Sequence, residues 1–198
     1  MPNHTRPACV VVDATVWAGA MTRAEILGRR ITNGDNLLHA CRAAADQGAA
    51  AGRVIADILE PAAAGTATAT RLCLSRQMQD QLTEHLTQQG LDRDHAVELT
   101  GLAAAVCEAS GGVADLDGRM SAQYWVPASL LLKGFVSPED IAVLSTAEAA
   151  IALSGGPVVL VTADVGLRRA ARVAAGRHIA VVTTTDYAPT AARRPARV

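Results

Sequence analysis

Short apolar runs that alternate with helical patterns constrain the fold of this chain more than any other feature of its sequence. Between the runs, apolar residues recur at helical spacing, as Met78, Leu82 and Leu86 do. Short apolar strands that alternate with helices predict an α/β fold, in which a mainly parallel sheet is flanked by helices. The runs that predict strands are residues 8–12, 71–74, 157–163 and 179–182.

The length and composition indicate one domain. A chain of 198 residues suffices for a single well-packed domain with a tail. Apolar residues make up 50% of the chain but aromatic residues only 3%, which favours closely packed helices on a sheet over an all-β sandwich. We therefore expect a single three-layer α/β/α domain over residues 1–187, followed by an Arg-containing disordered tail at residues 188–198.

The net charge and the spacing of the cysteines limit the classes of protein to which the chain could belong. The formal net charge of −1 gives no overall basic field for nucleic acid, although a local basic patch can coexist with an acidic centre. No apolar stretch approaches the length of a membrane span, and the polar first residues differ from a signal peptide, so we expect a cytoplasmic protein. The cysteines match no zinc-ligand spacing and are expected to be reduced thiols: Cys9, Cys41, Cys73 and Cys107.

Three aspartates stand where ligand sites form in α/β folds. Asp13 follows a run of valines, and Asp164 closes the apolar run at residues 157–163. Ligands bind at the carboxyl ends of strands in open α/β sheets, so two acids there suggest a shared acidic site. Asp140 lies in the first turn of a helix that the Ser-Pro-Glu sequence before it predicts. Converging carboxylates repel one another unless a hard cation such as Mg²⁺ or Mn²⁺ neutralises them.

Four acidic motifs occur in a characteristic order along the chain. They are Val-Val-Val-Asp13-Ala-Thr-Val, Leu-Ser75 through Asp80-Gln-Leu82, Glu139-Asp140-Ile-Ala-Val-Leu and Val-Thr162-Ala-Asp164-Val-Gly-Leu167. In this order the chain resembles the PIN-domain family of metal-dependent ribonucleases, over roughly residues 8–187. The closing segment, residues 179–187, is also similar to the family's last strand and short turn.

The resemblance implies an activity and the residues that carry it. The activity is hydrolysis of RNA phosphodiester bonds by in-line attack of water, which leaves 5′-phosphate and 3′-hydroxyl ends. The residues implied as ligands of Mg²⁺ or Mn²⁺ are Asp13, Asp140 and Asp164. Asp80 is the candidate for a fourth catalytic acid. The hydroxyls of Thr15 and Thr162 would orient a metal ligand or position the attacking water. The arginines that could bind the RNA backbone are Arg168 and Arg169.

The chain departs from the family pattern at two positions. Thr15 stands where the family commonly has Asn, and a hydroxyl can still form hydrogen bonds there. In the second motif, alignment from Ser75 places Gln81 where the family carries Glu, with Asp80 beside it and Glu84 one turn further on. Whether Asp80, Gln81 or Glu84 occupies the second acidic position stays open, and without a carboxylate there the site has three acids.

The expected function is therefore a metal-dependent endoribonuclease, and two alternatives remain. One is a PIN-like module with impaired catalysis that binds RNA or protein. A more distant one is a haloacid-dehalogenase-like phosphatase, although that family needs a second Asp where Thr15 stands. The expected partners are RNA and, if the chain is the toxin of a toxin–antitoxin pair, an antitoxin protein. Toxin domains of this type tend to be shorter than 198 residues, so the additional stretches at residues 18–70 and 113–135 weaken the toxin prediction. Either stretch could shape a substrate groove or a homodimer contact.

Overall fold

The computed structural model describes residues 9–63, 70–112, 136–154, 157–174 and 179–187. Within these ranges the chain forms a mixed α/β structure with four strands and seven helices. This arrangement confirms the α/β class expected from the alternating pattern. The expected tail at residues 188–198 and the additional stretch at residues 113–135 lie outside the described residues.

The four strands form one all-parallel sheet in the order β2-β1-β3-β4. Each is a short apolar run that the sequence predicts, and β1 lies in the centre with every residue at most 1% exposed. Valine-rich strands that are buried on both faces are typical of parallel sheets covered by helices. The strands are β1 (Cys9–Val12), β2 (Arg71–Cys73), β3 (Val158–Val161) and β4 (Ile179–Val182).

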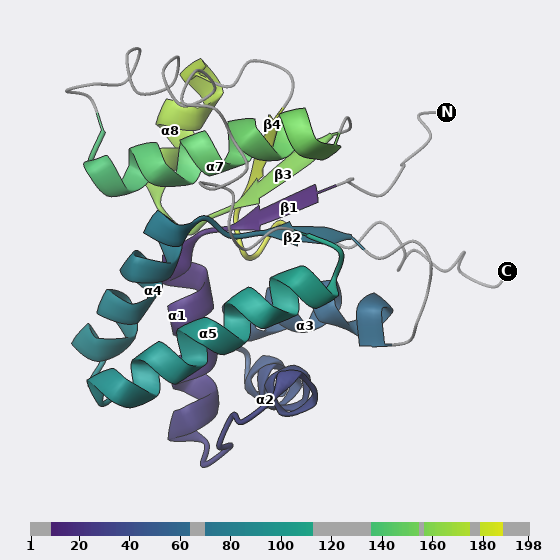
Figure 1. Cartoon of the computed structure of the whole chain (residues 1–198), viewed down its shortest axis with the longest axis vertical. Helices are drawn as coiled ribbons and strands as arrows, with labels where there is room; N and C mark the ends of the chain where they lie inside the picture. The colour runs from purple at the N-terminus through teal and green to yellow at the C-terminus, as the bar shows by residue number, and fades with distance from the viewer. Residues whose placement is uncertain (1–8, 64–69, 113–135, 155–156, 175–178, 188–198) are drawn as a thin grey trace, which may run out of the picture.

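The helices cover both faces of this sheet. Helices α7 and α8 lie on one side, and α1, α3 and α5 lie on the other, which gives the three layers expected (Figure 1). None of the described helices is both long and apolar enough to cross a membrane. Their bounds are α1 (Ala14–Ile26), α2 (Gly34–Asp46), α3 (Ala50–Ala63), α4 (Arg76–Gln88), α5 (Arg93–Ala109), α7 (Pro138–Ser154) and α8 (Val165–Ala174).

One expected helix end is wrong. The sequence predicts a helical stretch over residues 53–60 that Pro61 stops, but α3 begins at Ala50 and continues to Ala63. Proline removes one hydrogen bond of the helix and crowds the carbonyl four residues before it, and in the last turn little of the helix follows that this could disrupt. The alanines on both sides favour the helical conformation and extend α3 in both directions.

The segment that ends α5 protects the free edge of β2. Gly111, with φ +74°, ends the helix in a Schellman motif, in which the Gly112 N–H donates to the Cys107 carbonyl at 3.0 Å. Ser110 Oγ then accepts the N–H of Leu72 on β2 at 3.1 Å. A Cβ atom at Gly112 would stand 1.7 Å from the Leu72 carbonyl oxygen, so only glycine allows this approach. At Leu72 the outer edge of this strand is thereby contacted by the chain's own backbone and paired with its own side chain.

Candidate functional site

The strand order creates a topological switch point between β1 and β3. From β1 the chain passes to β2 on one side, and β3 later pairs with the other side of β1. Asp13 directly follows β1, and Asp164 follows β3 after Thr162 and Ala163. In Figure 1 the parallel strands β1 and β3 end at the same edge of the sheet. Both acids therefore lie at the carboxyl ends of the strands that flank the switch point. In open parallel sheets, ligands bind outside the strand ends at such a point.

Asp13 is a buried carboxylate with two hydrogen bonds. The residue is 5% exposed and caps the N-terminus of α1, where its Oδ1 accepts the Thr15 backbone N–H at 3.2 Å. Its Oδ2 accepts a hydrogen bond of 2.6 Å from the hydroxyl of Thr162. A carboxylate has about four acceptor sites, so these two bonds leave capacity for another partner. Thr15 is itself exposed, and its hydrogen bond to Asp13 is made by its backbone N–H.

Thr162 connects the two acids. Its hydroxyl donates to Asp13 and accepts the backbone N–H of Asp164 at 3.0 Å, and the residue is fully buried. Its backbone N–H donates to the Val182 carbonyl at 3.1 Å, which fixes it against β4. Asp164 Oδ1 accepts the N–H of Leu167 at 2.7 Å and so caps α8. A continuous path of hydrogen bonds thus joins the ends of β1 and β3.

Asp140 lies in the first turn of α7, which packs on β1 and β3 and begins at the edge where the strands end (Figure 1). Its Oδ2 accepts the Ser137 N–H at 3.2 Å, and its own N–H donates to Ser137 Oγ at 3.1 Å. This reciprocal pair is a capping box, which the Ser-x-x-Asp spacing could have predicted. The half-buried Asp140 therefore has one carboxylate oxygen engaged by its own helix.

The candidates on α4 occupy different surroundings. Gln81 is half-buried, and its side-chain Nε2 donates to the backbone carbonyl of Glu139 on α7 at 3.3 Å. Asp80 and Glu84 are exposed, and Glu84 Oε1 accepts a hydrogen bond of 3.2 Å from Gln88. Asp80, Gln81 and Glu139 line a groove of about 540 Å³ between α4 and the start of α7.

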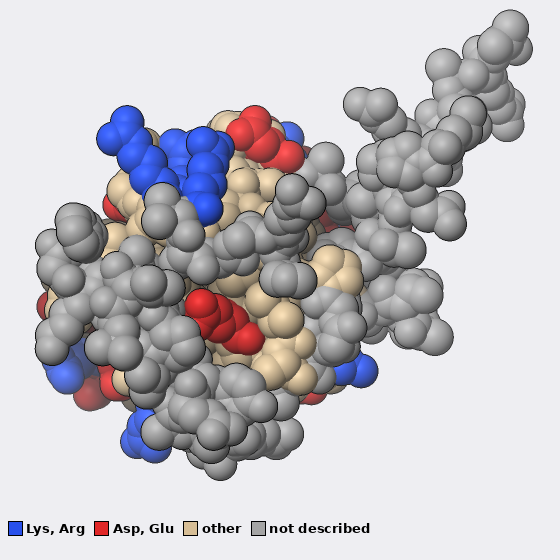
Figure 2. All heavy atoms as spheres, turned by 90° about the horizontal axis from the view of Figure 1, so that it is seen from above, with Lys and Arg blue, Asp and Glu red and all other residues tan. Residues whose placement is uncertain are grey.

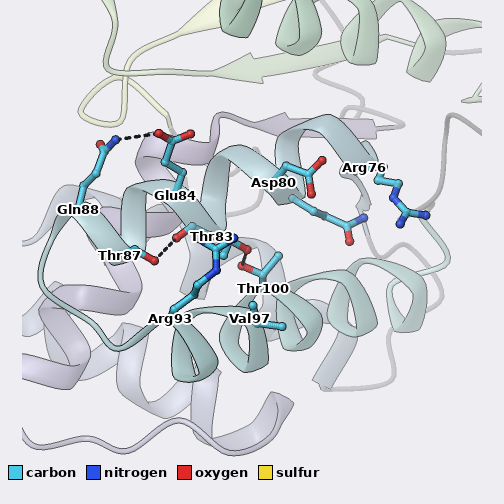
Figure 3. Close-up of a pocket in the computed structure, with 10 residues that line it drawn as sticks. Arg76, Asp80, Thr83, Glu84, Thr87, Gln88, Arg93, Val97 and Thr100 are labelled. Carbon is cyan, nitrogen blue, oxygen red and sulfur yellow. Dashed lines mark hydrogen bonds between the residues drawn. The ribbon is translucent and has the colours of Figure 1, made fainter.

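A second, larger groove of about 920 Å³ lies on the other flank of α4, between α4 and α5 (Figure 3). Its two helices are joined by a hydrogen bond of 2.9 Å from Thr83 Oγ1 to Thr100 Oγ1. Arg76 and Arg93 lie on different sides of this contact (Figure 3). Asp80 lines both grooves, so it is the acid on α4 that is accessible from either side.

The arginines that follow Asp164 lie on α8. Arg168 Nε donates to the Asp164 backbone carbonyl at 3.3 Å, which keeps this guanidinium close to the acid. Arg169 and Arg172 are exposed on the same helix. Figure 2 views the molecule from the side of α7 and α8 and shows a compact group of basic side chains there. A local basic patch thus coexists with a net charge of −1.

The donor atoms at this edge suit a hard divalent cation, because carboxylate oxygens are the ligands that Mg²⁺ and Mn²⁺ prefer. Asp13 also takes part in none of the ion pairs between described residues. In the part of the chain that the structure describes, however, no three His, Cys, Asp or Glu side chains are grouped so that they could hold a metal ion. The structure joins Asp13 to Asp164 through Thr162 and leaves Asp140 and Asp80 on separate helices.

Comparisons with known proteins give no further assignment. No family model matches the chain, and searches of the curated proteins and of the solved structures find no significant match.

Proposed function

We propose that this chain is a metal-dependent endoribonuclease with a PIN-like site at the switch point between β1 and β3. The observation that carries the proposal is the path of hydrogen bonds from Asp164 through Thr162 to the carboxylate of Asp13. A buried carboxylate is unfavourable unless it is hydrogen-bonded or paired with a cation. Here that carboxylate lies where open α/β sheets bind their ligands, and acceptor capacity is left for a cation.

Each residue has a distinct role in this proposal. Asp13 and Asp164 would hold Mg²⁺ or Mn²⁺, and Asp140 would complete the ligand set from α7. The ion, when bound, supplies charge that polarises the phosphodiester and lowers the pKa of the attacking water. Thr162 keeps the Asp13 carboxylate oriented, and Arg168 and Arg169 would bind the RNA backbone beside the site.

The direct test is cleavage of single-stranded RNA by the purified full chain with Mn²⁺, with Mg²⁺ and with a chelator. We expect cleavage only with the metals. Asp13→Asn and Asp164→Asn should each lower the rate by more than the roughly 10- to 100-fold loss that follows removal of an outer partner of a metal site. Asp46→Asn, at an exposed acid on α2, is the matched control and should retain the wild-type rate.

The outcomes of this test distinguish the proposed nuclease from its alternative. Thermal unfolding of every variant separates loss of catalysis from loss of fold. Wild-type activity in both Asp13→Asn and Asp164→Asn would contradict the proposed site. A folded wild-type chain that binds RNA but cleaves none with either metal would favour the alternative, a PIN-like binding module.

That alternative is favoured by one observation, the lack of a preassembled group of three acids among the described residues. A chain whose acids do not converge could bind RNA or a protein without cutting RNA. Within the nuclease proposal, a role as the toxin of a toxin–antitoxin pair would add an antitoxin protein as partner. An antitoxin gene directly upstream of this one would support that role.

A further inference from the structure

Gln81 makes a contact between α4 and α7 that the sequence pattern alone does not predict. Its side-chain Nε2 donates to the backbone carbonyl of Glu139 at 3.3 Å. Glu139 precedes Asp140, so the contact is made to the first turn of α7, where the candidate ligand lies. The helices also pack against each other along the groove that Gln81 helps to line.

The chemistry of this contact requires a hydrogen-bond donor at position 81. A carbonyl oxygen only accepts hydrogen bonds, and an ionised carboxylate has no proton to donate. A glutamate at this position would therefore direct a negative oxygen at the carbonyl of Glu139 and stand close to a second acid. The amide of Gln81, by contrast, is held half-buried between the two helices.

We infer that Gln81 is a positioning residue, which fixes the first turn of α7 and thereby the place of Asp140 at the edge of the sheet. The neighbouring Asp80 is then the acid that α4 presents, because it lines the groove between α4 and α7 while Gln81 is engaged with Glu139. The hydrogen bond from position 81 to the Glu139 carbonyl thus requires a donor rather than an ionised carboxylate. The consequence for metal binding rests on the proposed function, whereas the positioning of α7 does not.

The substitution that tests this inference is Gln81→Glu, which preserves the size of the side chain and removes its donor. Gln88→Glu is the matched control, because Gln88 lies on the same helix and its side chain donates to Glu84 within that helix. The first readout is hydrogen–deuterium exchange of the amides in the first two turns of α7, measured without metal. We expect exchange there to be faster by about 2- to 10-fold in Gln81→Glu, the range for loss of one hydrogen bond, and unchanged in Gln88→Glu.

The second readout is Mn²⁺ affinity, measured by titration of the same proteins. If Gln81 positions Asp140, Gln81→Glu weakens Mn²⁺ binding even though it adds a carboxylate. If position 81 instead faces the metal, Gln81→Glu strengthens binding, and that result would overturn the inference. Unchanged exchange in α7 would overturn it as well. A wild-type chain that binds no Mn²⁺ contradicts the proposed function alone, since the exchange of α7 is measured without metal.

Discussion

The two flanks of β1, one facing β2 and one facing β3, differ in the side chains that connect the neighbouring strands. Towards β2, the side chains in contact are thiols: Cys9 Sγ and Cys73 Sγ lie 3.0 Å apart, and both residues are buried. Their hydrogen bond and their burial raise the pKa of Cys9, so this thiol stays protonated. Towards β3, the contact is polar and lies at the strand ends, where the hydroxyl of Thr162 donates to Asp13.

The comparison shows that a cap residue at a strand end is not by itself a site. Ser75 follows β2 and caps α4 by accepting the N–H of Met78 at 3.2 Å, and it is fully buried. Asp13 and Asp164 also cap helices, but they are additionally connected across the strands through Thr162. A polar connection between strands at the switch point distinguishes the candidate site from the packed flank.

The largest expected effect disrupts β2, the strand of the packed flank, from its outer edge. Gly112→Ala would place a Cβ atom 1.7 Å from the Leu72 carbonyl oxygen, a clash between two backbone segments that cannot be relieved by rotating a side chain. We expect a loss of about 3 kcal/mol in the free energy of unfolding, measured by urea denaturation.

Gly101→Ala is the control for this substitution. Gly101 is exposed in the middle of α5 and has nothing within 4 Å of a Cβ atom placed there. Alanine favours a helix over glycine, so this variant should be more stable than the wild type by up to about 1 kcal/mol. Equal stabilities for the two variants would contradict the described packing against β2.

The second-largest expected effect disrupts the polar flank of β1, where the Thr162 hydroxyl donates to Asp13. Thr162→Val keeps the shape of the side chain but removes the partner of both Asp13 Oδ2 and the Asp164 N–H. We expect a loss of about 1–3 kcal/mol in the free energy of unfolding and a loss of about 10- to 100-fold in RNA cleavage. Thr146→Val is the control, since the hydroxyl of Thr146 is equally buried but bonds only within α7, to Ala142. Similar cleavage by both variants would show that Thr162 has no special role.

The smallest effect concerns α7, the helix that spans both flanks. Burial raises the pKa of Glu148 above its ordinary value of 4.5, so the neutral carboxyl group is more favoured in the folded chain than in the unfolded chain. The stability from this group is present below pH 4.5 and is lost as the pH rises through the folded-state pKa. Glu148→Gln should therefore raise Tm at pH 7 but not at pH 4. Solvent screening limits the gain to about 2 °C, and an equal gain at both pH values would contradict this assignment.

The sequence predicts the sheet and the place of the two strand-end acids well, for a physical reason. Strands buried on both faces need continuous apolar runs, so the positions of β1 and β3 can be identified from the sequence. Asp13 and Asp164 come just after these runs, so their place at the strand ends can be predicted as well. The caps at Ser75 and at the start of α7 are local signals of a few residues and are equally readable.

The contacts between distant elements could not be predicted in the same way. The bond from Gln81 to Glu139 depends on how closely α4 packs against α7, and no local pattern encodes that distance. The exposure of the Thr15 side chain likewise depends on the direction in which α1 leaves β1. The sequence therefore indicates which residues share an edge of the sheet, whereas the packing of the helices decides which of them touch.

The most direct test of the central claim is a double-mutant cycle on RNA cleavage with Mn²⁺, using Asp13→Asn, Asp164→Asn and the combined variant. If both acids serve one site, the second substitution adds little once the first is made, because residues that act as a unit are strongly non-additive. We predict that the combined variant cleaves within about threefold of the weaker single variant. A combined loss equal to the product of the two single losses would show that Asp13 and Asp164 act independently and would contradict a shared site at the switch point.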